Sequence, residues 1–379
     1  MPQNGMQLIE VVRLVLTGTP LREDVDWRTV VKLAKQHNLM GFVYHASRER
    51  EDLTPEQHKK LASMYELSVA QQLQQNVAAN AIYIALKEAG IRYMPLKGAW
   101  FRPLYPSQDL RFSCDIDFYF DISRAKEVYR LLVAQGFEKK REDVHNHVYT
   151  RGILTVEPHF AIADGDKEVA YFGDVWARGK SEDGIAFTLG DEDAYLYHLL
   201  HTYKHMKQGG AGVRSVIDTW VWNQNKPHMD RAYLEAECQK LGISKFVSAL
   251  ERLSHVWFDG LEADEEMQVL GDYILTGGAY GTAAQKAQME HVQGGGKKEL
   301  RRARRKYLLS RLFPTYGSLC LRYPVLKKWA ILTPIFWLIR LFATLFTPKR
   351  AVIEADLQVA QSIGEETAQT VTRIQQIIG

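Results

Sequence analysis

Two aspartates in a strand-like segment, Cys114-Asp115-Ile116-Asp117-Phe118, constrain this chain more than any other feature. Side chains two residues apart on a strand point to the same face, so Asp115 and Asp117 face one way while Ile116 and Phe118 turn into the core. Two carboxylates held so close repel each other unless a cation lies between them. We therefore expect a divalent metal here, although Asp-x-Asp at a strand end also occurs as a solvated edge or an Asx turn.

An apolar run upstream ends in a glycine turn, at Pro95-Leu96-Lys97-Gly98-Ala99. A glycine turn lets backbone N–H groups approach phosphates. Mg²⁺ takes oxygen ligands and is often shared with substrate phosphates. The turn and the aspartates together predict metal-dependent phosphoryl or nucleotidyl transfer, a chemistry that asks mainly for positioning and charge neutralisation.

The order of these motifs resembles the uncharacterised nucleotidyltransferase family of the DNA polymerase beta-like superfamily. The resemblance covers about residues 5 to 260. The segments that carry it are Ile91–Ala99, Leu104-Tyr105-Pro106, Arg111, Asp115-Ile116-Asp117, Val156-Glu157-Pro158-His159-Phe160, Asp191–His201 and Arg214–Asp218.

The resemblance implies an α+β fold whose polymerase beta-like core, a mixed sheet with helices, is flanked by N-terminal and C-terminal helical regions. It implies attack by a hydroxyl acceptor on the α-phosphorus of a nucleoside triphosphate, with release of pyrophosphate. Asp115, Asp117 and Glu157 match the trio of catalytic carboxylates that binds two Mg²⁺ (or Mn²⁺) ions. The residues expected to bind the nucleotide are Lys97, Gly98, Ala99, Arg111, His201, Lys204 and Arg214.

Two residues depart from the pattern of the superfamily. Ala99 replaces a residue that is usually Gly or Ser, and Glu157 stands where Asp is common and is followed by Pro158. These departures permit a catalytically degenerate nucleotide-binding or scaffold protein, although two intact aspartates argue against it. Within the enzyme class, a toxin-like nucleotidyltransferase acting on RNA or protein is the alternative.

Several side chains after the second acidic motif have more than one interpretation. His198, His201 and His205 share a helix face, which would suit zinc, but no thiolate or carboxylate completes a known spacing. Arg214 and Asp218 either line the cleft or form a helical ion pair at i, i+4. The glycines at 209–212 either approach phosphate or form a flexible loop.

Length and composition suit a globular protein of two domains, or of one domain with attachments: 379 residues, 46% hydrophobic, 25% charged, net charge +3. Three separated cysteines provide no disulfide framework, so we expect a reducing cytoplasm, and the N-terminus lacks the basic region of a secretory signal. A long helix from about Pro55 to Ala89 is expected to be a packing scaffold. The expected regions are 1–90 (helical), 91–190 (catalytic core), 191–292 (helical second lobe) and 297–379 (basic and apolar helical extension).

The C-terminal extension begins with a basic run, 297–306, and continues into an apolar stretch, Trp329–Phe346. About 18 apolar residues are borderline for a membrane span, and Arg340 would be costly in the bilayer core. We therefore favour a helix at an anionic membrane surface through residues 297–350, over a core helix pair. Nucleic acid fits less well, because the aromatics cluster with aliphatic residues. The expected location is cytoplasmic and peripheral at the inner face of the membrane, which suggests membrane-linked polysaccharide metabolism.

Overall fold

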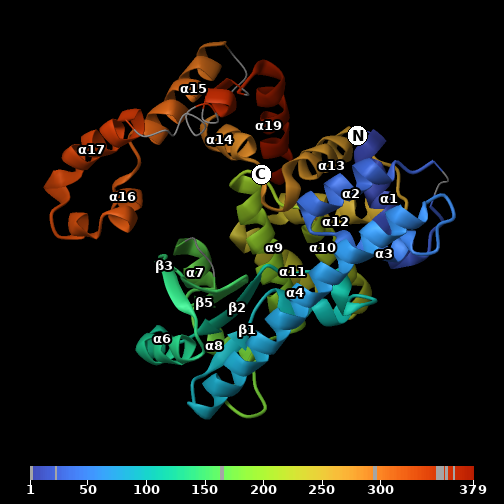
Figure 1. Cartoon of the computed structure of the whole chain (residues 1–379), viewed down its shortest axis with the longest axis horizontal. Helices are drawn as coiled ribbons and strands as arrows, with labels where there is room; N and C mark the ends of the chain where they lie inside the picture. The colour runs from blue at the N-terminus through green and yellow to red at the C-terminus, as the bar shows by residue number, and fades with distance from the viewer. Residues whose placement is uncertain are drawn as a thin grey trace.

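The computed structural model describes residues 3–21, 24–162, 166–292, 297–346, 354, 357–361 and 363–379. It confirms the predicted α+β fold, in which one mixed sheet lies among many helices (Figure 1). The N-terminal helices are α1 (Gln3–Thr17), α2 (Trp27–His37), α3 (Met40–Ser47) and α4 (Pro55–Glu88). The long helix α4 begins with a capping box between Thr54 and Gln57, which satisfies backbone donors that a helix start leaves open.

The five-stranded sheet has the order β1-β2-β5-β4-β3, and only β2 and β5 are parallel. Its strands are β1 (Tyr93–Pro95), β2 (Asp115–Phe120), β3 (Glu138–Glu142), β4 (His147–Arg151) and β5 (Leu154–His159). The short helices α5 (Gly98–Phe101), η1 (Arg102–Leu104) and η2 (Gln108–Leu110) connect β1 to β2, and η3 (Ile122–Arg124) leads into α6 (Ala125–Ala134).

One face of the sheet packs on α4 and α6. Ile116 and Phe118 of β2 point into this core, where they meet Ile82 and Leu86 of α4 and Leu132 of α6. The opposite face therefore carries the side chains that alternate with them on β2, as the sequence predicted.

The two edge strands of the sheet, β1 and β3, differ in their contacts and composition. The backbone of Tyr93 on β1 bonds to Ile185 and Phe187 of a later loop. At the other edge, β3 consists of five charged residues, Glu-Lys-Lys-Arg-Glu.

A helical lobe follows the sheet and shares one hydrophobic core with α1–α3. Its elements are α7 (Asp166–Phe172), α8 (Val175–Arg178), the hairpin strands β6 (Gly179–Lys180) and β7 (Thr188–Leu189), α9 (Asp191–Lys207), α10 (Val213–Asn225), α11 (Arg231–Leu241), α12 (Ser244–Phe258), α13 (Glu265–Gly277), η4 (Gly278–Tyr280) and α14 (Ala283–His291).

The C-terminal region contains α15 (Lys297–Leu312), α16 (Tyr316–Arg322), η5 (Pro324–Lys327), η6 (Ala330–Leu332), α17 (Thr333–Phe346) and α19 (Glu365–Ile378). Whereas α19 packs back on α12 and α13, the segment from α16 to α17 stands apart from the rest of the molecule (Figure 1). We call this segment, Tyr316–Phe346, the C-terminal arm. None of the helices in the described ranges is long and apolar enough to cross a membrane. Residues 347–350, which end the predicted membrane-binding segment, lie outside the described residues.

Candidate active site

The candidate active site is built on the neighbouring strands β2 and β5. Asp117 lies directly opposite Glu157 in their parallel register. Ligand atoms of Asp117, Glu157 and His159 all lie within 4.8 Å of one another. Two of the three predicted carboxylates, Asp117 and Glu157, lie in this cluster together with His159, whereas Asp115 is not one of its three members.

Lys97 reaches this cluster from the turn after β1. Its Nζ donates to Asp117 Oδ1 at 2.7 Å, and His159 Nε2 lies 2.8 Å from the same oxygen. The backbone of Lys97 has φ +48° and ψ −103°, a conformation that non-glycine residues rarely adopt. Such backbone strain tends to occur where a side chain must be held in a particular place, and here it accompanies an ammonium held against a carboxylate.

The three carboxyls of the site titrate differently. Burial alone would raise the pKa of Asp117, but the Lys97 ammonium and the His159 imidazole outweigh it and hold that pKa below its usual range. Burial, followed by the charge of Asp117, raises the pKa of Asp115. Burial and the charges of both aspartates raise the pKa of Glu157 to about 7. The cations of the site therefore do not fully neutralise the negative charge of its three carboxyls.

This donor set fits a divalent metal. Asp117 and Glu157 offer the oxygen ligands that Mg²⁺ and Mn²⁺ prefer. The pKa values of Asp115 and Glu157 are raised by burial first and then by repulsion between the carboxyls, and a cation would relieve that repulsion. The histidine of the cluster is compatible with Mn²⁺ and also serves as a hydrogen-bond partner that orients Asp117.

A cleft of about 490 Å³ opens over these side chains, between the sheet and the helices α9 and α10. Lys97, Asp115 and Glu157 line it on the sheet side. Three predicted nucleotide-binding residues line it on the helical side: His201, Lys204 and Arg214. The cleft thus places cations opposite the acidic cluster, an arrangement suited to an anionic substrate that bridges them.

The other predicted nucleotide-binding residues lie elsewhere. Gly98 and Ala99 line a second pocket of about 310 Å³, which also reaches Asp115 and Asp117. A Cβ on Gly98 would lie 2.6 Å from Ser113 Oγ and 3.1 Å from Arg111 Nη1. Glycine is therefore needed here for close approach of the turn to the Arg111 side chain.

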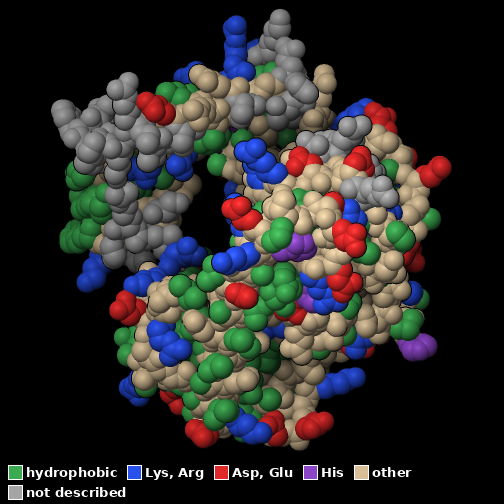
Figure 2. All heavy atoms as spheres, turned by 45° about the vertical axis from the view of Figure 1, so that its right-hand side comes forward, with side chains coloured by type: hydrophobic (Ala, Val, Ile, Leu, Met, Phe, Trp, Pro, Cys, Tyr) green, Lys and Arg blue, Asp and Glu red, His purple; other side chains and the backbone are tan. Residues whose placement is uncertain are grey.

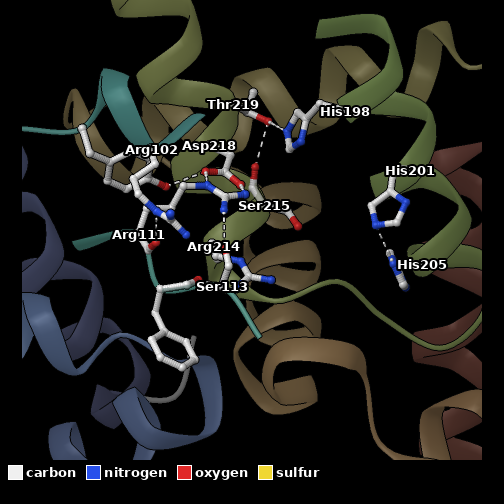
Figure 3. Close-up of polar contacts among 12 residues, drawn as sticks. Arg102, Arg111, Ser113, His198, His201, His205, Arg214, Ser215, Asp218 and Thr219 are labelled. Carbon is white, nitrogen blue, oxygen red and sulfur yellow. Dashed lines mark hydrogen bonds and ion pairs between the residues drawn. The ribbon is translucent and has the colours of Figure 1, made fainter. Parts of the chain in front are cut away.

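Arg111 forms a buried ion pair with Asp218 of α10 (Figure 3). Its Nε and Nη2 each donate to Asp218 at 2.9 Å, its Nη1 donates to Ser113, and Tyr105 also donates to Asp218. Asp218 therefore pairs with Arg111, and Arg214 instead donates to the carbonyl of Phe112 at 2.8 Å. Of the two predicted interpretations, Arg214 lines the cleft, and Asp218 forms its ion pair with the distant Arg111, a contact that the sequence alone does not reveal.

The three histidines of α9 do not converge on a metal. His198 is buried against Thr219, whereas His201 and His205 contact each other at 2.9 Å and lie apart from the Arg111 cluster (Figure 3). Burial lowers the pKa of His198 to about 4. Among the described residues, the acidic cluster with His159 is the one group with metal-ligating geometry.

The glycines after α9 serve close packing. A Cβ on Gly212 would lie 2.8 Å from the Cα of Ala279, and one on Gly209 would lie 2.6 Å from the Cα of Lys286. Backbone fills the space beside them, so these glycines let the loop between α9 and α10 pack closely against η4 and α14.

Several cleft residues were missed by sequence reasoning. Arg141, Asp143 and Asn146 come from β3 and the loop after it, and Asn146 donates to Glu157 Oε2 at 2.9 Å. Tyr197 and Tyr280 line the helical side. The loop histidine His145 also lines the cleft.

The sequence pattern of a family described as "uncharacterised nucleotidyltransferase" matches residues 23–259. The chain belongs to this family. The predicted resemblance is thereby confirmed, and membership supports transfer of a nucleoside monophosphate from a nucleoside triphosphate to a hydroxyl acceptor, a reaction class that generally uses divalent metal.

Among curated proteins nothing matches this chain. Among solved structures, it is similar to the antibiotic-resistance factor ANT(2'')-Ia, solved in solution, at 15% identity over 49% of this chain and 95% of that one. The TM-score is 0.25, so we base no argument on this likeness.

Proposed function

We propose that this protein is a Mg²⁺-dependent nucleotidyltransferase of the EC 2.7.7 type. The catalytic core would be residues 91–190, and the helical lobe 191–292 would close the other wall of the cleft. The observation that carries the proposal is the cleft itself, in which the half-buried carboxyls of Asp115 and Glu157, beside the Asp117–Lys97 pair, lie across from Lys204 and Arg214. A triphosphate with bound metal complements both walls.

The residues in and beside the cleft would have different roles in the reaction. Asp115, Asp117 and Glu157 would hold the metal, which stabilises charge on the attacking and leaving oxygens. Lys97, Lys204 and Arg214 would bind and orient the phosphates, since preorganised cations cost no rearrangement during reaction. Burial holds the pKa of His201 well below its usual value, so His201 would contact them as a neutral imidazole. Glu157, which lines the cleft, would also help to deprotonate or orient the acceptor hydroxyl.

The test uses the full chain and a variant that carries Asp115→Asn and Asp117→Asn. Each is incubated with Mg²⁺, each of the four α-³²P-labelled nucleoside triphosphates, and a cell extract containing lipids, proteins and RNA. We expect label transfer and pyrophosphate release from the wild type and a loss of at least about a thousandfold in the variant, because its charge stabilisation is removed.

Asp121→Asn is the matched control. Asp121 follows the same strand but caps η3, a role that Asn fills equally well. Label in protein or RNA would indicate the toxin-like alternative, and label in lipid or glycan would indicate polysaccharide metabolism. Metal-dependent nucleotide binding without any transfer would support the degenerate binding protein instead.

We also propose that the C-terminal arm docks on an anionic membrane surface at the cytoplasmic face. Its large apolar side chains are unusually exposed, including Trp329 at 61%, Ile331 at 83% and Ile335 at 52%. Figure 2 shows hydrophobic side chains gathered on this arm, with Lys and Arg side chains nearby. The preceding helix α15 adds exposed cations, which would meet acidic headgroups while the apolar residues insert.

Vesicle flotation tests this docking. With vesicles containing phosphatidylserine, the full chain should float, and Ile331→Asp with Ile335→Asp should reduce the floating fraction about tenfold or more, because each charge must leave water to insert. Leu67→Asp with Val77→Asp on α4 is the matched control, because these side chains are 73% and 70% exposed far along the chain from the arm. Equal loss in both variants, or flotation on neutral vesicles alone, would contradict the proposal.

A further inference from the structure

The second pocket beside the acidic cluster has a different chemical lining from the cleft. One face of α4 supplies Gln75, Asn76, Asn80 and Tyr83 to it, and Gly98 and Ala99 form its opposite wall. Its volume of about 310 Å³ is within the size range of small-molecule sites. We call it the amide-lined pocket.

Gln75, which lines this pocket, has a side-chain oxygen that accepts no hydrogen bond from the described residues. The residue is 5% exposed, and its Oε1 has no hydrogen-bond partner among the described residues. A buried carbonyl oxygen without a donor costs about 1–3 kcal/mol in desolvation. A ligand that brings an N–H or O–H donor to Gln75 would recover this free energy through a small rotation of the amide.

The charges of the two cavities assign them to different parts of a nucleotide. The amide-lined pocket contains one cation, Arg102, which already donates to Asn76 Oδ1 at 2.5 Å, and it contains Asp115 and Asp117. Away from the metal that these two aspartates would hold, the charged side chains of this pocket are negative on balance. The cleft has four cations, Lys97, Arg141, Lys204 and Arg214, against three acids, Asp115, Asp143 and Glu157, so the phosphates belong on that side.

Asp115 lines both cavities, whereas Glu157 lines only the cleft. Because the cations of the cleft place the phosphates there, Asp115 marks the border between the phosphates and the rest of the nucleotide. The neutral nucleoside would then occupy the amide-lined pocket, which lies on the other side of Asp115. Glutamine and asparagine amides pair with adenine in a bidentate manner, accepting from its N6 amine and donating to N7.

We propose that the amide-lined pocket recognises the base of the nucleoside triphosphate and selects a base with an exocyclic amine, adenine before the others, through Gln75 with Asn80. This inference rests on the proposed function, because it deepens the same site. The amide face of α4 thereby becomes the specificity determinant of the reaction.

Binding measurements with the full chain in Mg²⁺ test the inference without requiring turnover. The probes are ATP, ITP, in which the amine is replaced by an oxygen, and inorganic tripolyphosphate, which has no base. Wild type should bind ATP about tenfold or more tightly than ITP, the size expected when one buried hydrogen-bonding group loses its partner. Gln75→Leu should abolish this preference while leaving tripolyphosphate affinity within about twofold of wild type.

Gln74→Leu is the matched control, because Gln74 is the exposed neighbour on the same helix and does not line the pocket. Asn80→Ala, an exposed position that cannot disturb the core, should weaken ATP selectively as a second variant. Equal affinity of wild type for ATP and ITP would overturn the inference. So would an unchanged ATP affinity in Gln75→Leu, or a parallel loss of tripolyphosphate binding. Selective ATP binding without label transfer would keep the base pocket and reject the proposed reaction.

Discussion

Among the individual side chains, Lys97 balances the carboxyls of the site. Its Nζ lies 2.7 Å from Asp117, and its side chain is 20% exposed. The low pKa of Asp117 means that this pairing stabilises the fold above the usual aspartate pKa, and that the contribution is lost as the pH falls through the lower folded value. Near neutral pH, the pairing of Lys97 with Asp117 therefore contributes its full stabilisation of the fold.

Lys97→Met should lower the free energy of unfolding at pH 7.5 by about 3–5 kcal/mol, because it leaves a buried carboxylate without its cation. Urea denaturation measures this change. Adding Asp117→Asn should recover much of the loss, and the double-mutant cycle gives the coupling between the two residues. Strictly additive single effects would show that the contact contributes nothing.

His198 predicts a pH dependence of stability. Burial lowers its folded pKa to about 4 from the ordinary value of 6.5. Between these values the unfolded chain binds more protons, so stability falls as the pH decreases from 6.5 toward 4, by about 3 kcal/mol from this residue. His198→Gln should flatten the slope of unfolding free energy against pH in this window, with the exposed His228→Gln as control. An unchanged slope would contradict the assignment.

The turn between β1 and α5 joins the site to the interior of the molecule. Gly98 lets this turn pack against Ser113 and Arg111, and Arg111 in turn bonds to Asp218 of α10. The position of Lys97 over Asp117 therefore depends on contacts with the helical lobe as well as on its own strand.

Gly98→Ala should destabilise the fold by about 1–3 kcal/mol, because its Cβ would lie 2.6 Å from Ser113 Oγ in a packed environment. Adding Ser113→Ala removes the clashing oxygen and should restore part of the stability. Thermal unfolding of the two variants measures both effects. If Ser113→Ala brings no recovery to Gly98→Ala, the contact with Ser113 is not the cause.

Local patterns predicted the elements well. Alternation along β2 placed Asp115 and Asp117 on one face and Ile116 in the core, and α4 is helical over nearly its predicted length. The pairing of β2 with β5 was not predicted, since nothing local in either strand specifies its partner. The sequence predicted α4 only as a packing scaffold. The Gln and Asn side chains of α4 line a pocket only once the turn at Gly98 lies opposite them.

For the molecule as a whole, the sequence predicted the acidic residues of the site and the helical wall of the cleft better than the wall supplied by β3 and the loop after it. Asp117 and Glu157 lie in recognisable motifs, whereas Arg141 and Asn146 reach the cleft only through the folding of β3 and β4 against β5. The buried pair of Arg111 with Asp218 was missed for the same reason, because ion pairs between distant segments leave no periodic signal. Shared hydrophobic packing of α1–α3 with the helical lobe likewise became visible only in three dimensions.

The borders of the sheet have a consequence for how the protein behaves at high concentration. An open strand can recruit a strand from another molecule and start aggregation. Here the loop around Ile185 covers the backbone of β1, and β3 presents Glu138, Lys139, Lys140, Arg141 and Glu142. A second copy approaching β3 would have to bring charged side chains of like sign together and strip water from them. Both edges of the sheet therefore disfavour the addition of a strand from a second molecule at high protein concentration.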